Sequence, residues 1–476
     1  MSASSELWRW DATQMAAAIA ARKVSAREVV AACLARTRQV NPALNAVTVD
    51  LSAAALEAAV LADAAVARGD ALGPLHGVPV LVKENVDQAG CATTNGIPAF
   101  REVMAADDSP VVANLRAAGA VLAGRTNTPG FSFRLDTDND LRGRTFNPWS
   151  AQHTPGGSSG GAASAVAAGM APIGHGNDIA GSIRYPAYCC GLVGLRPSFG
   201  RVPAFNPSAT AERAPGAQIL SVQGPIARRV RDIRLALGAM AARDVRDPWW
   251  VPAPLEGPPV PRPIRVAVVR EPEALAGQRL HPTVAAALDQ AARWLADAGY
   301  EIVDEPTPGF TRAMELWFAA EVPEIRGFMW PAIQQYGDLG IKRAIGLMFE
   351  TVPAEDGLPY MKALAERARV VRAWQQFLDR VPLVLAPTCT QPPYAIGFDV
   401  QDAARTEQVW RECVTLTAVP MLGVPGLAVP TGVVNGLPTG VTIVAPRFRE
   451  DLALAAGEAI EARSGMAGRV PIDPRT

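Results

Sequence analysis

The segment from Thr154 to Pro186 contains two short glycine-rich turns, and each turn carries a serine. Ser158 lies in GGSSGG, and Ser182 lies in NDIAGSIR. Glycines at this density allow positive φ angles and let the backbone approach other groups closely. Such turns can direct several N–H groups at an anion, either a phosphate or a developing oxyanion. A serine in each turn makes nucleophilic catalysis the first hypothesis.

Apolar, β-branched runs alternate along the chain with amphipathic helical patterns. Residues 11–67 are predicted to be helical, with a break at which Ser25 caps the second helix. PLHGVPVLVKENVD predicts a buried strand that carries Lys83, residues 308–380 are predicted to be mostly helical, and Asn435–Gly436 predicts a hairpin turn. This alternation predicts an α/β fold with a mixed, mostly buried sheet covered by helices.

Lys83 is unusual because the chain has only four lysines among 45 Lys and Arg residues. Arginine stays protonated, whereas a buried lysine can lose its proton, because burial disfavours the charged form. Lys83 is therefore a candidate for a neutral amine that acts as a base near neutral pH. The alternative is a structural lysine paired with Glu84 or Asp87.

The GGSSGG turn allows other interpretations. It could be a flexible turn that caps the following helix. Gly156–Gly160 also fits G-x-S-x-G, the nucleophile elbow of a serine esterase, which requires a histidine downstream. Only His175 and His281 follow Ser158. His175 is very close in sequence and His281 begins an ordinary helix, so the pattern favours a base other than histidine.

The NDIAGSIR turn also has two interpretations. Successive backbone N–H groups after Asp178 could form an oxyanion hole beside the Ser182 hydroxyl. Alternatively, the segment is a plain turn in which Asp178 caps local amides. Arg184 either pairs with Asp178 or contacts substrate.

Several function classes lack support in the sequence. The net charge is −1 with no charged block, so neither nucleic acid nor an anionic membrane is an expected partner. The chain begins without a signal-peptide pattern and has no apolar run of transmembrane length. Six cysteines without metal-ligand spacing predict buried thiols in a reducing compartment, the cytoplasm. Residues 136–140 mimic a calcium loop but lack its glycine and final glutamate, which predicts a polar surface loop. No nucleotide or metal motif is present, so no cofactor or metal is expected.

Taken together, these motifs resemble the amidase signature family of Ser-Ser-Lys amide hydrolases. The resemblance spans most of the chain in family order, through GPLHGVPVLVKENVD, GRTNTP, FNPW, TPGGSSGG, GNDIAGSIRYPA, GLVGLRPSFGRVP, LAPT and GLPTGVTIVAP. The serine block is locally similar to that of 6-aminohexanoate cyclic-dimer hydrolases. The resemblance implies one α/β/α domain over residues 1–476. Within it we expect N-terminal helices over 1–67, a catalytic core over 70–250 and a helical insertion over 308–380 that walls the substrate pocket.

The resemblance also assigns roles by position. It implies that Lys83 is the base, Ser158 the bridging serine beside a cis peptide bond, and Ser182 the nucleophile. Two further groups of residues are implied, the oxyanion-hole amides and the supporting side chains; they are Ile179, Ala180, Gly181 and Ser182, and Asp178, Arg184 and Ser159. Ala180 departs from the glycine common at its position, which puts the geometry of the hole in question.

The implied activity is hydrolysis of a small or medium amide, aryl or cyclic, through an acyl-enzyme on Ser182. Trp317, Trp330 and Trp374 are candidates for an apolar substrate pocket or, equally, for the core. The alternatives are an amidotransferase A-type subunit that works with partner subunits, a serine esterase, and an inactive binding protein. The natural substrate stays open, as does the oligomeric state, with a homo-oligomer as one option.

Overall fold

The computed structural model describes residues 3–352 and 357–471, and in these ranges eleven strands form a single mixed sheet. Their order across the sheet is β1-β3-β2-β4-β6-β5-β10-β11-β9-β7-β8. The strand bounds are β1 Val47–Asp50, β2 Pro79–Lys83, β3 Val121–Thr126, β4 Ile173–Asp178, β5 Val193–Arg196, β6 Val222–Ala227, β7 Arg265–Val268, β8 Glu301–Val303, β9 Leu383–Pro387, β10 Gly426–Val434 and β11 Leu437–Val444.

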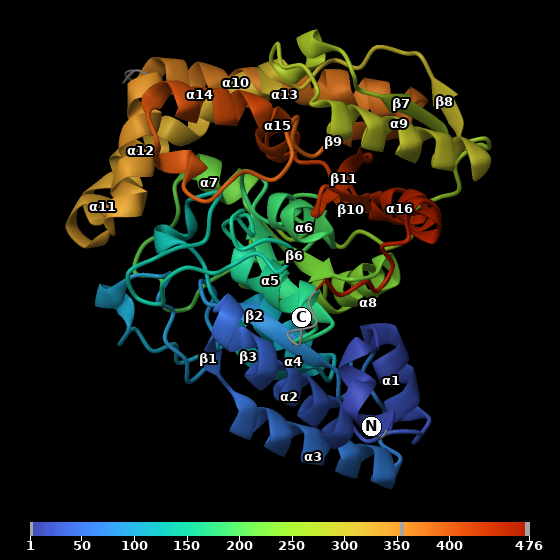
Figure 1. The fold of residues 1–476 in the computed structure, drawn as a ribbon. Helices are drawn as coiled ribbons and strands as arrows, with labels where there is room; N and C mark the ends of the chain where they lie inside the picture. The colour runs from blue at the N-terminus through green and yellow to red at the C-terminus, as the bar shows by residue number, and fades with distance from the viewer. Residues whose placement is uncertain (1–2, 353–356, 472–476) are drawn as a thin grey trace.

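Helices cover both faces of this sheet (Figure 1). The helix bounds are α1 Ala12–Ala20, α2 Ala26–Leu44, α3 Ser52–Arg68, α4 Pro110–Ala117, α5 Gly160–Ala167, α6 Arg184–Cys190, α7 Pro215–Leu220, α8 Val230–Met240, α9 Pro282–Asp297, α10 Thr311–Glu324, α11 Trp330–Tyr336, α12 Leu339–Thr351, α13 Gly357–Arg380, α14 Ala403–Glu412, α15 Val414–Leu422 and α16 Glu450–Ser464. Helices α4, α8, α16 and α9 form one row, in which each contacts the next, and α2, α5 and α6 form another. The predicted α/β fold with a mixed, helix-covered sheet is confirmed.

Most local predictions agree with the structure, and one is wrong. Helix α2 begins after Ser25, whose side chain accepts from the Glu28 amide in a capping box. Strands β10 and β11 are joined at Asn435 and Gly436, both with positive φ, as expected for a tight hairpin. The predicted helical region 11–67 is interrupted by β1, because its β-branched sequence VTVD pairs antiparallel with β3 at the edge of the sheet.

The sheet brings two distant segments to one edge. Strands β2 and β4 are adjacent and parallel, so their carboxyl ends lie on the same side of the sheet. Strand β2 ends at Lys83 and β4 ends at Asp178, directly before the NDIAGSIR turn continues toward Ser182. Crevices at the carboxyl ends of strands are common ligand sites in α/β proteins. The topology therefore gathers the predicted site residues in one place.

Two other sequence expectations concern the whole chain. All six cysteines are free and buried, as predicted, while the compartment stays a prediction. Across residues 3–352 and 357–471, no helix is both long and apolar enough to cross a membrane.

The capping box at the start of α2 can be tested by mutation. Ser25→Ala removes the side chain that accepts from the Glu28 amide, and we expect the free energy of unfolding to fall by about 1 kcal/mol. Urea unfolding followed by circular dichroism measures this. Ser25→Gly is the control, since glycine at an N-cap costs only a few tenths of a kcal/mol. No measurable loss in Ser25→Ala would show that the hydroxyl contributes nothing.

Candidate active site

The Lys83 ammonium position is enclosed by neutral groups. Lys83 is fully buried, and its Nζ lies 2.8 Å from Ser158 Oγ, 3.2 Å from Ser159 Oγ and 2.7 Å from Asn177 Oδ1. Within the described chain it makes no ion pair.

The two carboxylates that offered an alternative partner are engaged elsewhere. Glu84 accepts from Thr94 Oγ1 at 2.5 Å, and Asp87 accepts from Ser208 Oγ at 2.8 Å. The interpretation of Lys83 as a lysine paired with Glu84 or Asp87 is therefore wrong.

Burial lowers the pKa of Lys83 well below its ordinary value of 10.5, and the nearby charge of Asp178 opposes this only in part. A neutral amine has two N–H donors and one lone pair. Asn177 Oδ1 can only accept, so it takes one N–H. One donor and the lone pair remain for the Ser158 and Ser159 hydroxyls. This arrangement suits an amine that receives a proton from a serine.

The GGSSGG turn is held against a neighbouring loop. A Cβ on Gly157 would lie 2.3 Å from the carbonyl oxygen of Arg134, so only glycine fits there. Thr137 Oγ1 donates to the Gly156 carbonyl at 2.8 Å. The Gly157–Ser158 peptide bond is cis, as the family resemblance implied. Close packing thus fixes the position from which Ser158 reaches Lys83.

The loop that holds this turn was expected at the surface, and that prediction is wrong. Asp136 is fully buried and accepts from Arg144 Nη1 at 2.6 Å and from Thr154 Oγ1 at 2.7 Å. Asn139 is also buried and donates to the Thr128 carbonyl at 2.6 Å. The polar side chains satisfy one another inside the protein, which composition alone did not reveal.

The second turn presents Ser182 and departs from the family pattern without strain. Among the described residues of this turn, positive φ falls on Gly181, at 96°, and not on Ala180. A Cβ on Gly181 would also lie 2.6 Å from Leu416 Cβ. Replacement of the usual glycine by Ala180 therefore leaves the backbone path of the turn intact.

The two turns are in contact, but the described structure has no hydrogen bond between the Ser158 and Ser182 hydroxyls. The Ser159 amide donates to the Ser182 carbonyl at 3.3 Å. Ser182 is 7% exposed, and among the described residues its hydroxyl has no hydrogen-bond partner. Catalytic hydrogen bonds are often long in ligand-free enzymes and tighten when substrate binds.

Asp178 organises the second turn from within. Its buried carboxylate pairs with Arg184 at 3.0 Å and Arg196 at 3.6 Å, and it accepts from the Gly181 amide at 2.8 Å. Burial alone would raise the pKa of Asp178, but the two arginines and the amide lower it below its ordinary value. The Gly181 N–H is thus engaged inside the protein, which removes it from the set of four amides expected to face an oxyanion. The amides of Ile179, Ala180 and Ser182 remain.

Arg184 behaves as the structural interpretation predicted. Its guanidinium is fully buried and also donates to the carbonyls of Thr415, at 2.9 Å, and Leu416, at 2.6 Å. It ties the turn to α15 and supports Asp178 rather than facing a ligand.

The histidines do not complete a serine–histidine pair. His281 is the N-cap of α9 and accepts from the Thr283 amide. His175 is buried against Gln223 at 2.8 Å, and burial lowers its pKa to about 3. Neither histidine that follows Ser158 is therefore available as the base that a serine esterase elbow at Ser158 requires.

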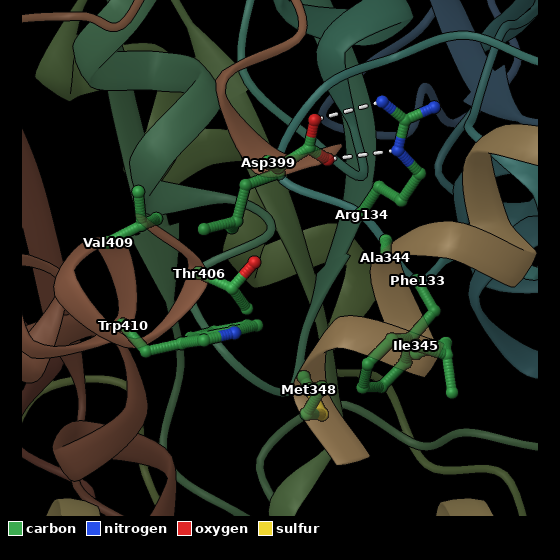
Figure 2. A pocket seen from close by; sticks show the side chains of 10 residues that line it. Phe133, Arg134, Ala344, Ile345, Met348, Asp399, Thr406, Val409 and Trp410 are labelled. Atoms are coloured by element: carbon green, nitrogen blue, oxygen red, sulfur yellow. Dashed lines mark hydrogen bonds and ion pairs between the residues drawn. The ribbon is translucent and has the colours of Figure 1, made fainter. Parts of the chain in front are cut away.

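A cavity lies next to the loop that packs on the GGSSGG turn, and Figure 2 shows the side chains that line it. Apolar and aromatic side chains dominate its lining, which comprises Phe133, Arg134, Leu135, Ala344, Ile345, Met348, Asp399, Thr406, Val409 and Trp410. Arg134 and Asp399 face each other as a bidentate ion pair at 2.9 Å. The backbone of Arg134 and Leu135 packs on Gly157, and Leu416, which packs on Gly181, shares an apolar cluster with Leu135 and Trp410. The cavity thus borders the GGSSGG turn, and Leu416 connects its lining to the Ser182 turn.

The tryptophans expected to line a pocket do not line this cavity. Trp317 and Trp374 are fully buried in the core, and Trp330 packs on Phe349 with ring centroids 5.2 Å apart. The tryptophan at the cavity is Trp410, from α14, outside the predicted insertion 308–380. That region does contribute residues 344, 345 and 348.

Sequence reasoning missed Asn177 and Trp410. Asn177 directly precedes Asp178 in the serine block, so its place at the end of β4 beside β2 was a usable signal. Trp410 carries no local motif, and only the packing of α14 against α12 brings it to the cavity.

Comparison with known proteins shows the family of this chain. The family profile described as Amidase matches residues 28–454. An indoleacetamide hydrolase from Bradyrhizobium diazoefficiens is 47% identical over 97% of this chain and 87% of its own length. A glutamyl-tRNA(Gln) amidotransferase A-type subunit from Heliobacterium modesticaldum is 30% identical over 94% of this chain and 96% of its own length. The solved structure of 6-aminohexanoate cyclic dimer hydrolase with substrate superposes with a TM-score of 0.83, at 28% identity over 98% of this chain and 99% of that one.

The chain therefore belongs to the amidase family, and its fold is the amidase signature fold. It is an amide hydrolase that acts on a C–N bond, as the sequence predicts.

The burial of Lys83 predicts a pH-dependent stability. Between its lowered folded pKa and 10.5, the unfolded chain holds more protons at Lys83 than the folded chain does, so wild-type stability rises with pH. Relative to Lys83→Met, the wild type should gain up to about 1.4 kcal/mol per pH unit in this window. Urea unfolding from pH 7 to pH 10 measures the difference. Lys23→Met, at an exposed lysine, is the control, and a difference that does not change with pH for Lys83→Met would contradict the neutral amine.

Proposed function

We propose that this protein hydrolyses a primary amide of an arylacetic acid, with indoleacetamide as the first candidate, through an acyl-enzyme on Ser182. The observation that carries the proposal is the fully buried Lys83 Nζ, 2.8 Å from Ser158 Oγ and without a carboxylate partner among the described residues. A lysine in this setting is a base near neutral pH, and Ser158 is the group next to it on the path to Ser182.

The reaction has two halves. Lys83 takes a proton from Ser158, which takes one from Ser182, while Ser182 Oγ attacks the amide carbonyl carbon. The tetrahedral oxyanion accepts hydrogen bonds from the amides of Ile179, Ala180 and Ser182. When the C–N bond breaks, the proton returns along the same path to the leaving nitrogen, and ammonia departs. Water then attacks the ester on Ser182 with the same base, which releases the carboxylic acid and restores the serine. Ser159, Asp178 and Arg184 hold these groups in place.

The lining of the cavity suits an aromatic ring, and because the cavity volume is about 20 Å³, side chains must move apart before an aromatic acyl group can enter. Trp410 forms one wall, and Ile345 and Met348 form the other (Figure 2). The buried hydroxyl of Thr406 also lines the cavity and lacks a hydrogen-bond partner among the described residues. An unpaired buried acceptor favours a ligand that carries a donor, and an indole N–H is such a donor. The similarity to an indoleacetamide hydrolase points to the same substrate class.

The catalytic assignment predicts that Ser182→Ala lowers kcat at least about 1,000-fold, and that Lys83→Ala and Ser158→Ala cause large losses as well. A fluorophosphonate probe should label Ser182, because an activated serine attacks phosphorus as it attacks a carbonyl. Trypsin releases residues 145–184 as one peptide that holds both serines, so fragment ions must place the adduct.

Matched variants separate the alternatives. Labelling should disappear in Lys83→Ala and persist in His281→Ala, since His281 caps α9. An adduct on Ser158, or activity that requires His281, would contradict the proposal and favour a serine esterase. The amidotransferase alternative requires partner subunits, so full turnover of a simple amide by the purified single chain excludes it.

The Thr406 contact makes a prediction about substrate choice. Thr406→Val keeps the shape of the side chain and removes its acceptor. We expect kcat/KM for indole-3-acetamide to fall about five- to tenfold, in line with about 1 kcal/mol for one hydrogen bond. The matched substrate is 1-naphthaleneacetamide, which has a similar bicyclic ring and no N–H, and its kcat/KM should not fall. Equal losses for both substrates would contradict a contact between Thr406 and the ring N–H.

A further inference from the structure

A buried tryptophan from a distant helix holds one carbonyl of the Ser182 turn. Trp317 lies in α10 and is fully buried, and its indole Nε1 donates to the carbonyl oxygen of Ile179 at 2.9 Å. The contact joins residues 138 positions apart in the sequence. The hydrogen bond links α10 directly to the peptide unit that joins Ile179 to Ala180.

Peptide planarity makes this contact directional. The C=O and N–H of a trans peptide point in opposite directions. The Ile179 carbonyl and the Ala180 N–H belong to one peptide unit. A donor that fixes the carbonyl toward α10 therefore fixes the Ala180 N–H away from α10.

The neighbouring peptide units of the turn are anchored in the same way. Arg196 Nη1 donates to the Asp178 carbonyl, which directs the Ile179 N–H. The Tyr185 amide donates to the Gly181 carbonyl at 2.7 Å, which directs the Ser182 N–H. In the remaining unit the N–H itself is held, since Gly181 donates to Asp178 Oδ1 at 2.8 Å. Each peptide from Asp178 to Ser182 thus has one fixed polar atom.

We propose that Trp317 is a positioning residue for the oxyanion hole: by holding the Ile179 carbonyl, it aims the Ala180 N–H at the oxyanion. This rests on the proposed acyl-enzyme mechanism. An oxyanion donor contributes through its preset direction, because a donor that must reorient during the reaction loses much of its effect. Trp317 supplies that direction from outside the turn.

Trp317 also connects the hole to the cavity. Its ring stacks on that of Trp410, with centroids 5.7 Å apart and planes at 29°, and Trp410 lines the cavity (Figure 2). An aromatic acyl group packed on Trp410 thus rests on the same stack that holds the Ile179 carbonyl. Substrate binding and oxyanion stabilisation share one support.

The chain offers a matched control for the experiment. Trp374 is also fully buried, belongs to the same apolar cluster and donates from Nε1 to a backbone carbonyl, that of Gly309, at 3.2 Å. It also stacks on an aromatic ring, that of Phe310, at 4.8 Å. Trp317→Phe and Trp374→Phe therefore remove the same atoms from the same kind of environment, and the two sites differ in the released carbonyl and in the stacked ring, Trp410 or Phe310.

We expect Trp317→Phe to lower kcat about tenfold or more with KM changed less than twofold, and Trp374→Phe to change neither by more than twofold. The inhibition constant of phenylboronic acid, which forms a tetrahedral adduct with an active serine, should rise with Trp317→Phe by the same factor as kcat falls. The inhibition constant of indole-3-acetic acid, the planar product, should stay within twofold. A merely structural tryptophan would affect both inhibitors alike.

Equal effects of the two substitutions, or a loss in Trp317→Phe that appears in KM and not in kcat, would overturn the proposal. If Trp317→Phe does not fold, 3-benzothienylalanine at position 317 replaces the N–H by sulfur with nearly the same shape and gives the same test. Failure of the underlying mechanism looks different, because Ser182→Ala would then keep its turnover and the wild type would take up no fluorophosphonate on Ser182.

Discussion

The structure depends on keeping a lysine amine buried at the end of a strand without an acid beside it. Lys83 is enclosed by two hydroxyls and an amide oxygen, all of which can accept and none of which carries a charge. A single carboxylate at this point would stabilise the protonated form of the amine and oppose the lowering of its pKa. The negative charge of Asp178 acts on Lys83, and Arg184 and Arg196 pair with that carboxylate. The buried arginines thus protect the lysine as well as the turn. Burial of these two arginines costs desolvation free energy, which their ion pairs with Asp178 offset in part.

The elements that the sequence predicts well are those whose cause is local. The positive φ of Gly156 and Gly181 is a local requirement of each turn, so the two serine turns could be recognised directly from their glycines. The β-branched run that ends at Lys83 predicts a buried strand because its pattern needs no other information. The alternation of strands and helices likewise predicts the mixed sheet. The cap at Ser25 belongs to the same class, because both partners lie within one turn of helix.

The elements that the sequence does not predict depend on residues far apart. Trp317 and Trp410 are both tryptophans without a local sequence motif. Trp317 lies in the core and Trp410 lines the cavity, because the packing of α10, α14 and α15 decides the environment of each side chain. The composition of the loop 136–140 predicts an exposed loop. Its Asp136 carboxylate is buried because Arg144 and Thr154, which lie outside the loop, donate hydrogen bonds to it. The engagement of the Gly181 amide by Asp178 is local, but its direction depends on two arginines that hold the carboxylate. Spacing indicates which groups are present, whereas packing decides which way they face.

The same distinction explains why alanine is tolerated at position 180. In a turn whose amide directions were set only by its own φ and ψ angles, an added methyl would restrict those angles and could misdirect the N–H. Here Arg196, Trp317 and the Tyr185 amide hold three of the carbonyls from outside, and Asp178 holds the remaining amide. With each peptide plane fixed by a hydrogen bond to a well-packed partner, the identity of residue 180 matters only through the space its side chain needs. The geometry of the Ser182 turn is therefore a property of the packed structure around it, and the serine motif alone does not contain it.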